Sequence, residues 1–324
     1  MALPGEFETM SIKILLAILA TFFIFHQSNA QCCAAGNPIS GDGSASGMAK
    51  KVMEVSLFYQ HSYSDTYYDG SRKTDYKYID YSYFDFLSLN VAYGISNRLK
   101  VSAELGYFFS KAQVFDFGFD RNAYGVGDLV LGAQYMAYRS GPRSFEVYPS
   151  FHVTLPVGTF DQVSGVVVLP IDLQPSSGSF KYKAGVLLSK RYLTNKLAFF
   201  FDGSVEFSQR INTERTNYKY GNLYNLSFFG SYKIFKRLTG AVQARGQIRD
   251  KASDSNRETL HSTGGYYIFI SPQLRYNFWK SWNIAATFEY PVYKNPNGRQ
   301  LTNSYAYTLR LSRAIDFNRK RTDL

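Results

Sequence analysis

Apolar and polar residues alternate along most of the chain that follows residue 51. In the stretch GDLVLGAQYMAYR (127–139), for example, Leu131 and Ala133 occupy one set of alternate positions, and Gly132 and Gln134 occupy the other. A period of two predicts a β-strand whose two faces differ in polarity. Such a strand fits a soluble sandwich, and it also fits a membrane barrel whose apolar face contacts lipid.

The connections between the alternating segments distinguish these two folds. About twelve segments alternate in this way, at 51–63, 80–93, 99–111, 127–139, 145–157, 179–192, 197–210, 223–235, 238–250, 266–278, 282–292 and 302–314. Short connections at 94–98, 140–144, 193–196, 235–237 and 279–281 take turns with longer polar stretches at 64–78, 112–124, 158–178, 211–222, 251–265 and 293–301. Short periplasmic turns that alternate with long extracellular loops are typical of outer-membrane barrels. We therefore predict an all-β fold, a transmembrane antiparallel β-barrel of about twelve strands over residues 51–317, followed by a C-terminal tail at 318–324.

The charged residues of these segments fall mostly on one face, which is predicted to line the lumen because charge is costly on the lipid face. The candidate lumen-lining residues are Glu54, Lys100, Glu104, Asp128, Glu146, His152, Lys181, Lys183, Asp202, Glu206, Arg245, Arg275, Glu289 and Arg310, together with Arg191 and Lys233. They either pair across strands and stiffen the barrel, or form a selectivity lining that decides which solutes pass. The same face carries Phe58, Phe86, Phe108, Phe200, Phe229 and Phe269, which either pack in a narrow barrel or form an apolar track.

The first thirty residues have the features of an export signal. Lys13 precedes the apolar run ILLAILATFFIF (14–25), and small residues follow it up to Ala30. The run is too short to span a bilayer as a helix. We predict a cleaved signal peptide at 10–30 that begins at Met10. A flexible periplasmic tail, rich in Gly, Ser and Ala, is predicted at 31–50.

The predicted tail contains the only two cysteines, Cys32 and Cys33. Adjacent cysteines form only a strained disulfide, and no other cysteine is present for an internal bridge. They are therefore either free or intermolecularly oxidised thiols, or a site for a soft metal such as copper, since thiolates are preferred ligands of Cu(I). No other cofactor is expected.

The composition agrees with an outer-membrane barrel. The chain has 27 Tyr and 27 Phe among 324 residues, yet its mean hydropathy is −0.24. Alternating lipid and lumen faces average to such a hydropathy, and interfacial girdles account for the aromatic residues. The net charge of +11 would suggest nucleic acid as a partner of an intracellular protein. Export argues against that partner, so the charge is attributed to solvated loops and lumen, or alternatively to attraction for anionic solutes or lipid head groups.

Two short motifs resemble those of a known family. YGVGDLVLGAQY (124–135) and PSFHVTLPVGTF (149–160) are similar to segments of the outer-membrane transporters of the MetA pathway of phenol degradation. The many aromatic residues and the adjacent cysteines near the start of the predicted tail suggest a member of the Bacteroidetes type. The matching residues are Gly125, Gly127, Asp128, Leu155, Pro156 and Gly158, with Val157 at a position where Thr is common. The resemblance implies a barrel through which small, often hydrophobic, compounds pass, and it implies no catalytic residues.

The expected function is therefore passage of small solutes, hydrophobic and aromatic ones included, through a non-enzymatic channel in the outer membrane. Two other classes stay open: a barrel that acts as a scaffold or receptor for a periplasmic or surface protein, and an enzyme like the outer-membrane phospholipases. Ser150 and His152 lie close in sequence, but both are predicted on the lumen face, and no Ser-His-Asn constellation is evident. The apolar loop at 158–178 is predicted either to fold into the lumen as a constriction or to contact a partner.

Overall fold

The computed structural model describes residues 49–318, except for 117, 119, 142–144, 165–166, 193–195 and 280. The predicted signal peptide, Cys32, Cys33 and most of the predicted C-terminal tail lie outside the described residues. No helix in the described part of the chain is long and apolar enough to cross a membrane.

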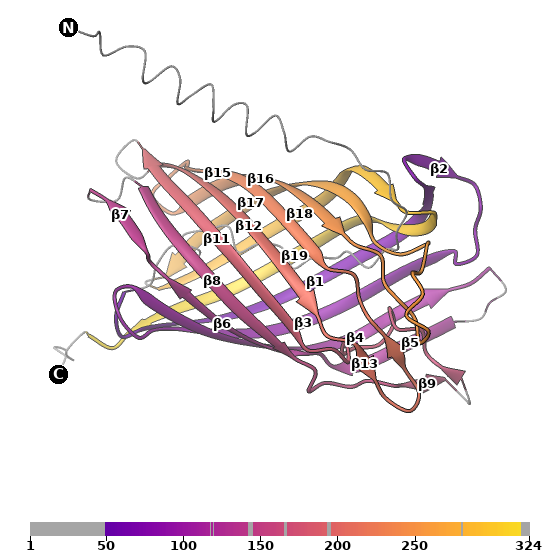
Figure 1. Cartoon of the computed structure of the whole chain (residues 1–324). Helices are drawn as coiled ribbons and strands as arrows, with labels where there is room; N and C mark the ends of the chain where they lie inside the picture. Colours follow the sequence, from indigo (N-terminus) through magenta and orange to yellow (C-terminus); the bar gives the residue numbers. More distant parts are fainter. Residues whose placement is uncertain are drawn as a thin grey trace, which may run out of the picture.

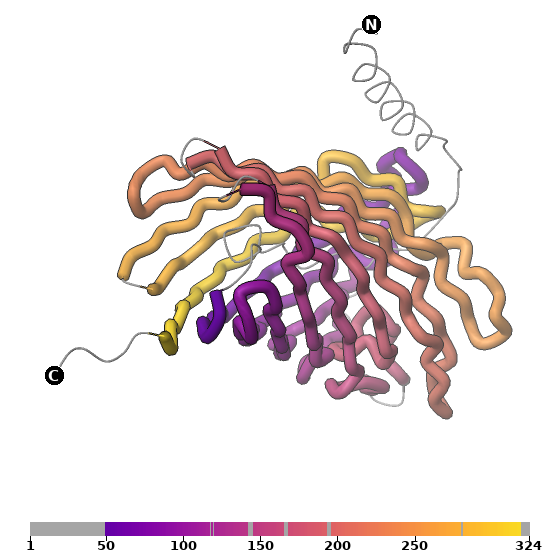
Figure 2. The backbone as a smooth tube through the Cα atoms, turned by 60° about the vertical axis from the view of Figure 1, so that its left-hand side comes forward, coloured from indigo at the N-terminus to yellow at the C-terminus, as the bar shows by residue number. Residues whose placement is uncertain are grey.

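Twelve long strands form a closed antiparallel barrel, as the alternation of the sequence predicts (Figure 1). They are β1 (Val52–Asp69), β3 (Tyr81–Gly94), β4 (Leu99–Val114), β6 (Leu129–Tyr135), β8 (Phe145–Leu155), β11 (Lys181–Tyr192), β12 (Leu197–Ser208), β15 (Leu223–Lys233), β16 (Leu238–Arg249), β17 (Gly265–Trp279), β18 (Trp282–Pro296) and β19 (Arg299–Asp316). Neighbours in this series pair with one another, and β1 pairs with β19, which closes the barrel. Figure 2 shows the first strand (indigo) beside the last (yellow).

The seven remaining strands lie at the two ends of the barrel, and all of them have two or three residues except β5, which has 7, as many as β6. They are β2 (Arg72–Thr74), β5 (Asp120–Val126), β7 (Tyr138–Ser140), β9 (Val163–Ser164), β10 (Val167–Val168), β13 (Ile211–Asn212) and β14 (Asn217–Tyr218). β2, β5, β9 and β13 lie at the end with the long connections, and β7 lies at the other (Figure 1). Short turns face the periplasm in outer-membrane barrels, so the end with the long connections is the extracellular one.

Four predicted boundaries are wrong. The predicted loop at 64–78 contains the end of β1 and the short β2. The stretch 293–301 is not a long loop, because β18 and β19 continue to a tight turn at Asn297 and Gly298, where Gly298 has a φ of +62°. An Asn-Gly pair is a strong hairpin signal, and it outweighs the polarity of the stretch.

The other two wrong boundaries flank the motif at 124–135. The predicted loop at 112–124 instead contains the end of β4 and most of β5. The predicted strand at 127–139 is interrupted, because Gly127 and Asp128 separate β5 from β6 and β6 already ends at Tyr135. Both β5 and β6 pair with β4, so they form one wall of the barrel with a break in the middle.

The two faces of the strands differ as the alternation predicts. On the outer face, Leu131 is 41% exposed, and many large apolar and aromatic side chains are equally open. On the inner face, Tyr148, Phe229 and Phe269 are fully buried together with polar residues such as Gln247. The lumen is therefore partly filled by packed side chains, and the remaining space lies toward β1, β3, β4, β6, β8, β11 and β12.

Candidate functional site

A cavity of about 580 Å3 occupies the unfilled part of the lumen. It is lined by ten of the fourteen charged or histidine residues predicted from the sequence: Glu54, Lys100, Glu104, Asp128, His152, Lys181, Lys183, Asp202, Glu206 and Arg310. Phe58, Phe86 and Phe108 line it as well. Its extracellular end is lined by residues of the connection between β8 and β11, residues 156–180, which we call the infolded loop.

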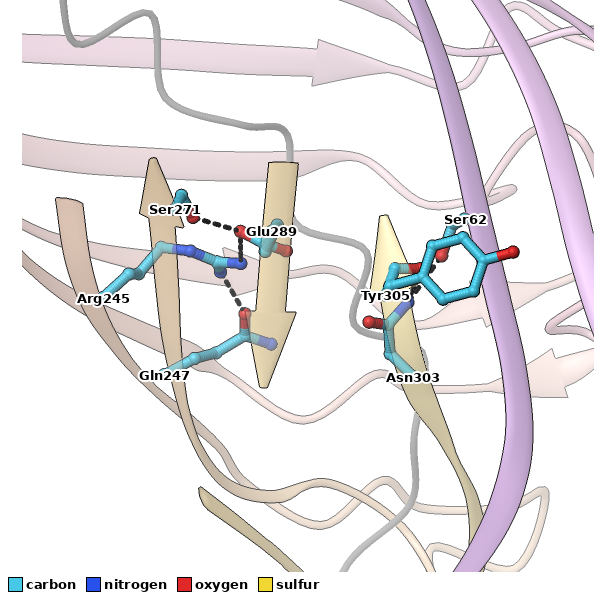
Figure 3. A network of polar contacts seen from close by, with 7 residues as sticks. All are labelled: Ser62, Arg245, Gln247, Ser271, Glu289, Asn303 and Tyr305. Atoms are coloured by element: carbon cyan, nitrogen blue, oxygen red, sulfur yellow. Dashed lines mark hydrogen bonds and ion pairs between the residues drawn. The ribbon is translucent and has the colours of Figure 1, made fainter. Parts of the chain in front are cut away.

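Three of the remaining four predicted residues take part in buried ion pairs beside the cavity. The guanidinium group of Arg245 donates to Glu289 at 2.7 Å and to Gln247 at 2.6 Å (Figure 3). Arg245 also lies over the ring of Phe269, 4.3 Å from its centroid. Buried charges need such pairing and hydrogen bonding to offset the loss of hydration. This group therefore closes the β16–β18 side of the lumen.

Glu146 is the centre of a second ion-pair group, near the periplasmic end. It accepts from Arg139 at 2.8 Å and from the hydroxyl of Tyr148 at 2.7 Å, and Arg191 lies 3.7 Å away. Tyr148 belongs to an apolar cluster with Met136, Leu187, Ala198, Phe200 and Phe229. Arg275, the last predicted residue, lies outside the residues that line the cavity, in β17 directly opposite Thr239 and Ala285. Glu146, Arg245 and Glu289 are thus all engaged in ion pairs in this part of the lumen.

Asp128 holds the infolded loop in place. Its carboxylate accepts hydrogen bonds from the hydroxyls of Ser176 and Ser177, both at 2.5 Å, and from the backbone N–H of Ser177 at 3.1 Å. The hydroxyl of Tyr220 donates to the carbonyl of Ser177 at 3.1 Å from the next extracellular connection. Hydrogen bonds to a charged acceptor are stronger than those between neutral groups, so Asp128 is the main polar contact of the loop with the barrel.

A second set of contacts ties the tip of the loop to β4. Lys111 donates to the carbonyl of Gln174 at 2.8 Å, and the side-chain amide of Gln113 donates to the carboxyl of Asp172 at 3.0 Å. Leu173 and Leu169 pack against Ala123 in a small buried cluster. Burial raises the pKa of the Asp172 carboxyl, although Lys111 opposes the shift. The loop tip is therefore a packed part of the lumen, which is the first of the two alternatives that the sequence left open.

The outer edge of β5 is covered by the same loop. In the described part of the chain β5 pairs with β4 alone. The side chain of Gln162 donates to the carbonyl of Tyr124 at 2.7 Å and accepts from the backbone N–H of Tyr124 at 3.3 Å. The backbone N–H of Thr159 donates to the carbonyl of Val126 at 2.8 Å. The loop thereby forms hydrogen bonds with backbone groups of Tyr124 and Val126 at a strand edge that would otherwise be open.

Comparison with protein families identifies the chain. The profile of the family described as "Putative MetA-pathway of phenol degradation" matches residues 66–311. The chain belongs to this family. No curated protein sequence matches the chain.

Solved structures support the barrel fold of this MetA-pathway family member. The COG4313 outer membrane channel from Pseudomonas putida F1 is 15% identical, with a TM-score of 0.72, and the match covers 86% of this chain and 100% of that one. The KdgM porin in complex with oligogalacturonate (13% identical, TM-score 0.44, covering 80% and 98%) and the NanC porin (15% identical, TM-score 0.47, covering 81% and 98%) are less similar. The first of these likenesses establishes an outer-membrane barrel fold.

The motif residues that resemble the family meet at one place in the structure. Gly158 approaches the backbone so closely that an added Cβ would lie 2.2 Å from the carbonyl oxygen of Val126 and 2.3 Å from that of Gly127. Gly125 has a φ of +142°, and an added Cβ would lie 2.4 Å from the hydroxyl of Thr159. Glycine is therefore required where the infolded loop leaves β8 and crosses the break between β5 and β6. Asp128 lies at the same crossing.

Several residues of the site were not predicted from the sequence. Ser176, Ser177, Asp172 and Gln113 lie in stretches that were assigned to loops, and their partners are far away in sequence. The apolar sequence VSGVVVLPI at 163–171 was the only signal that this loop is unusual. Among the described residues, no group of three or more His, Cys, Asp or Glu side chains is arranged to hold a metal ion.

Proposed function

We propose that the chain is an outer-membrane channel for small solutes, hydrophobic and aromatic compounds included, and that the infolded loop controls its extracellular entrance. The observation that carries this proposal is the lumen cavity of about 580 Å3, whose walls are the inner faces of the strands and whose extracellular end is the loop. Cavities of this size are typical of sites for small molecules.

Two further features support passage of solutes. Phe58, Phe86 and Phe108 line the cavity beside charged residues, so a solute with an aromatic part meets apolar as well as polar contacts. The similar structure from Pseudomonas putida is described as an outer membrane channel, and the family is described by a pathway of phenol degradation.

An enzymatic function has less support from the geometry. Ser150 and His152 both line the cavity. Within the described residues, however, the buried Nδ1 of His152 has no hydrogen-bond partner. A hydrolytic triad needs a third group that orients the imidazole, so we propose a channel rather than a lipid hydrolase.

Swelling of proteoliposomes tests the proposed function. Liposomes that contain the purified protein are expected to swell faster than protein-free liposomes in a series of small neutral solutes, and the rate is expected to fall with solute size. Rates equal to those of protein-free liposomes, both for the natural protein and for a variant with a shortened infolded loop, would contradict the proposal. Calcium-dependent release of fatty acid from the same liposomes would instead favour an enzyme.

A further inference from the structure

One group of charged residues in the cavity takes part neither in the ion pairs nor in the contacts with the infolded loop. Lys183 lies directly opposite His152 on β8 and Glu206 on β12. Asp202 lies on the same face of β12, four residues before Glu206, and all four residues line the cavity. Among the described residues, no ion pair within 4 Å or hydrogen bond joins Lys183, Asp202 or Glu206 to a partner. We call these three residues the charge trio.

The charge trio faces the open space rather than its own wall. Lys183, Asp202 and Glu206 line the cavity together with His152 of β8 and Glu104 of β4, and β4 is separated from β11 by β6 and β8. The charge trio therefore borders the space that β4, β8 and β12 share. A cation and two carboxylates that are close but unpaired leave room for a ligand that bears both signs of charge.

A second observation on another wall of the cavity also indicates a ligand. Gln60 on β1 and Thr308 on β19 are direct cross-strand partners, and both line the cavity. Their exposed fractions are 4% and 5%, yet the side-chain Nε2 of Gln60 and Oγ1 of Thr308 have no hydrogen-bond partner in the described structure. A buried polar group without a partner is costly. A solute with polar groups would satisfy both.

We propose that the cavity binds small zwitterions that also carry an aromatic or apolar group, a proposal that deepens the proposed channel function and rests on it. The carboxylate of the solute contacts Lys183, and its ammonium group contacts Asp202 and Glu206. Gln60 and Thr308 supply neutral hydrogen bonds. Phe58 and Phe86, which also line the cavity, provide apolar contact.

Block of the ion current in planar bilayers tests this proposal with four probes of one shape. L-phenylalanine carries both charges, 3-phenylpropionate carries only the carboxylate, phenethylamine carries only the ammonium group, and 2-phenylethanol carries neither. The half-blocking concentration of L-phenylalanine is expected to be at least about tenfold below those of the other three, since a hydrogen bond to a charged group contributes roughly that factor or more. Equal half-blocking concentrations for all four probes would overturn the proposal.

Two variants separate a ligand contact from a merely structural role. Lys183→Gln is expected to weaken block by L-phenylalanine and 3-phenylpropionate about tenfold, with block by phenethylamine unchanged or stronger. Glu206→Gln is expected to weaken block by L-phenylalanine and phenethylamine, with block by 3-phenylpropionate unchanged or stronger. Lys236→Gln and Glu258→Gln, at exposed positions outside the lumen candidates, serve as matched controls. Variants that change block by all probes alike would refute the assignment of the charge trio. A natural protein that conducts no ions and admits no solute would instead refute the proposed function itself.

Discussion

Asp128 accepts hydrogen bonds from the hydroxyls of two consecutive serines of the infolded loop, Ser176 and Ser177, and from the backbone N–H of Ser177. Asp128→Asn removes the charge from these contacts and is expected to weaken seating of the loop by about 1.5–3 kcal/mol. The barrel is expected to stay folded, because Asp128 lies in the break between β5 and β6 rather than in a strand. Limited proteolysis then cuts within 156–180 faster than in the natural protein. The exposed Asp75→Asn is the matched control, and equal cleavage rates in both variants would show that Asp128 does not hold the loop.

At Gly158 the backbone of the infolded loop closely approaches the backbone of Val126 and Gly127. Gly158→Ala places a methyl group within 2.3 Å of two carbonyl oxygens of β5 and the break that follows it. Neither oxygen belongs to a flexible side chain, so we expect a destabilisation of about 1–3 kcal/mol at this crossing. Hydrogen exchange of the amides around 156–160 measures the effect. Gly246→Ala, where the nearest atom is 3.9 Å from the added Cβ, is expected to leave hydrogen exchange at 156–160 unchanged. Equal protection of these amides in the two variants would contradict the prediction.

Asp172 makes the seating of the loop depend on pH. Because burial raises the pKa of its carboxyl, the seated loop binds a proton more tightly than the released loop does, even with Lys111 and Arg121 nearby. Seating is therefore firmest at acidic pH and weakens as the pH rises from the ordinary value of about 3.9 through the raised one. Open probability in planar bilayers is expected to increase with pH over this window. Asp172→Asn should abolish the part of the pH dependence that comes from the loop, while an unchanged pH profile would assign it to other groups.

At the scale of the strands, β16, β17 and β18 form the side of the lumen that is filled by packed side chains. Arg245 and Glu289 have exposed fractions of 3% and 4%, so removal of one partner leaves a buried charge alone. Glu289→Ala is expected to destabilise the barrel by about 3–5 kcal/mol, whereas the double variant Arg245→Met with Glu289→Leu costs much less. The temperature at which each variant loses its fast-migrating folded form on gels measures its stability. A double variant as unstable as the single one would indicate that the pair, rather than the filling of this space, stabilises the wall.

The hairpin of β18 and β19 shows how strand length was misjudged from the sequence. Polar residues on both faces of 293–301 suggested a loop, since alternation ends where the strands leave the membrane. The strands nevertheless continue, because backbone pairing does not require an apolar face: β18 pairs with β17 up to Pro296, and β19 pairs with β1 from Arg299. The same effect concealed β5 within a predicted loop.

At the scale of the whole molecule, the strand number and the orientation of the faces follow from the alternation of apolar and polar residues, and the barrel follows from the alternation of short and long connections. A period of two assigns each side chain to lipid or lumen, and ten of the fourteen predicted residues line the cavity. The infolded loop was beyond this reasoning. Its position depends on contacts such as those of Asp128 with Ser176 and Ser177, which are 48 and 49 residues apart in sequence, and alternation carries no information on loops. The pairing of Arg245 with Glu289 was unpredictable for a similar reason. The alternation predicts that both side chains face the lumen, but it does not predict that they contact each other.

The central claim is that the infolded loop blocks the extracellular end of the lumen cavity, and single-channel conductance tests it most directly. The measurement compares the natural protein with a variant in which residues 162–175 are replaced by a short Gly-Ser linker, after gel mobility has shown that both form the heat-modifiable barrel. We predict a conductance several-fold larger in the variant, because the loop residues at the extracellular end of the cavity are then absent. An equal conductance in the two folded proteins would contradict the claim that this loop is the barrier.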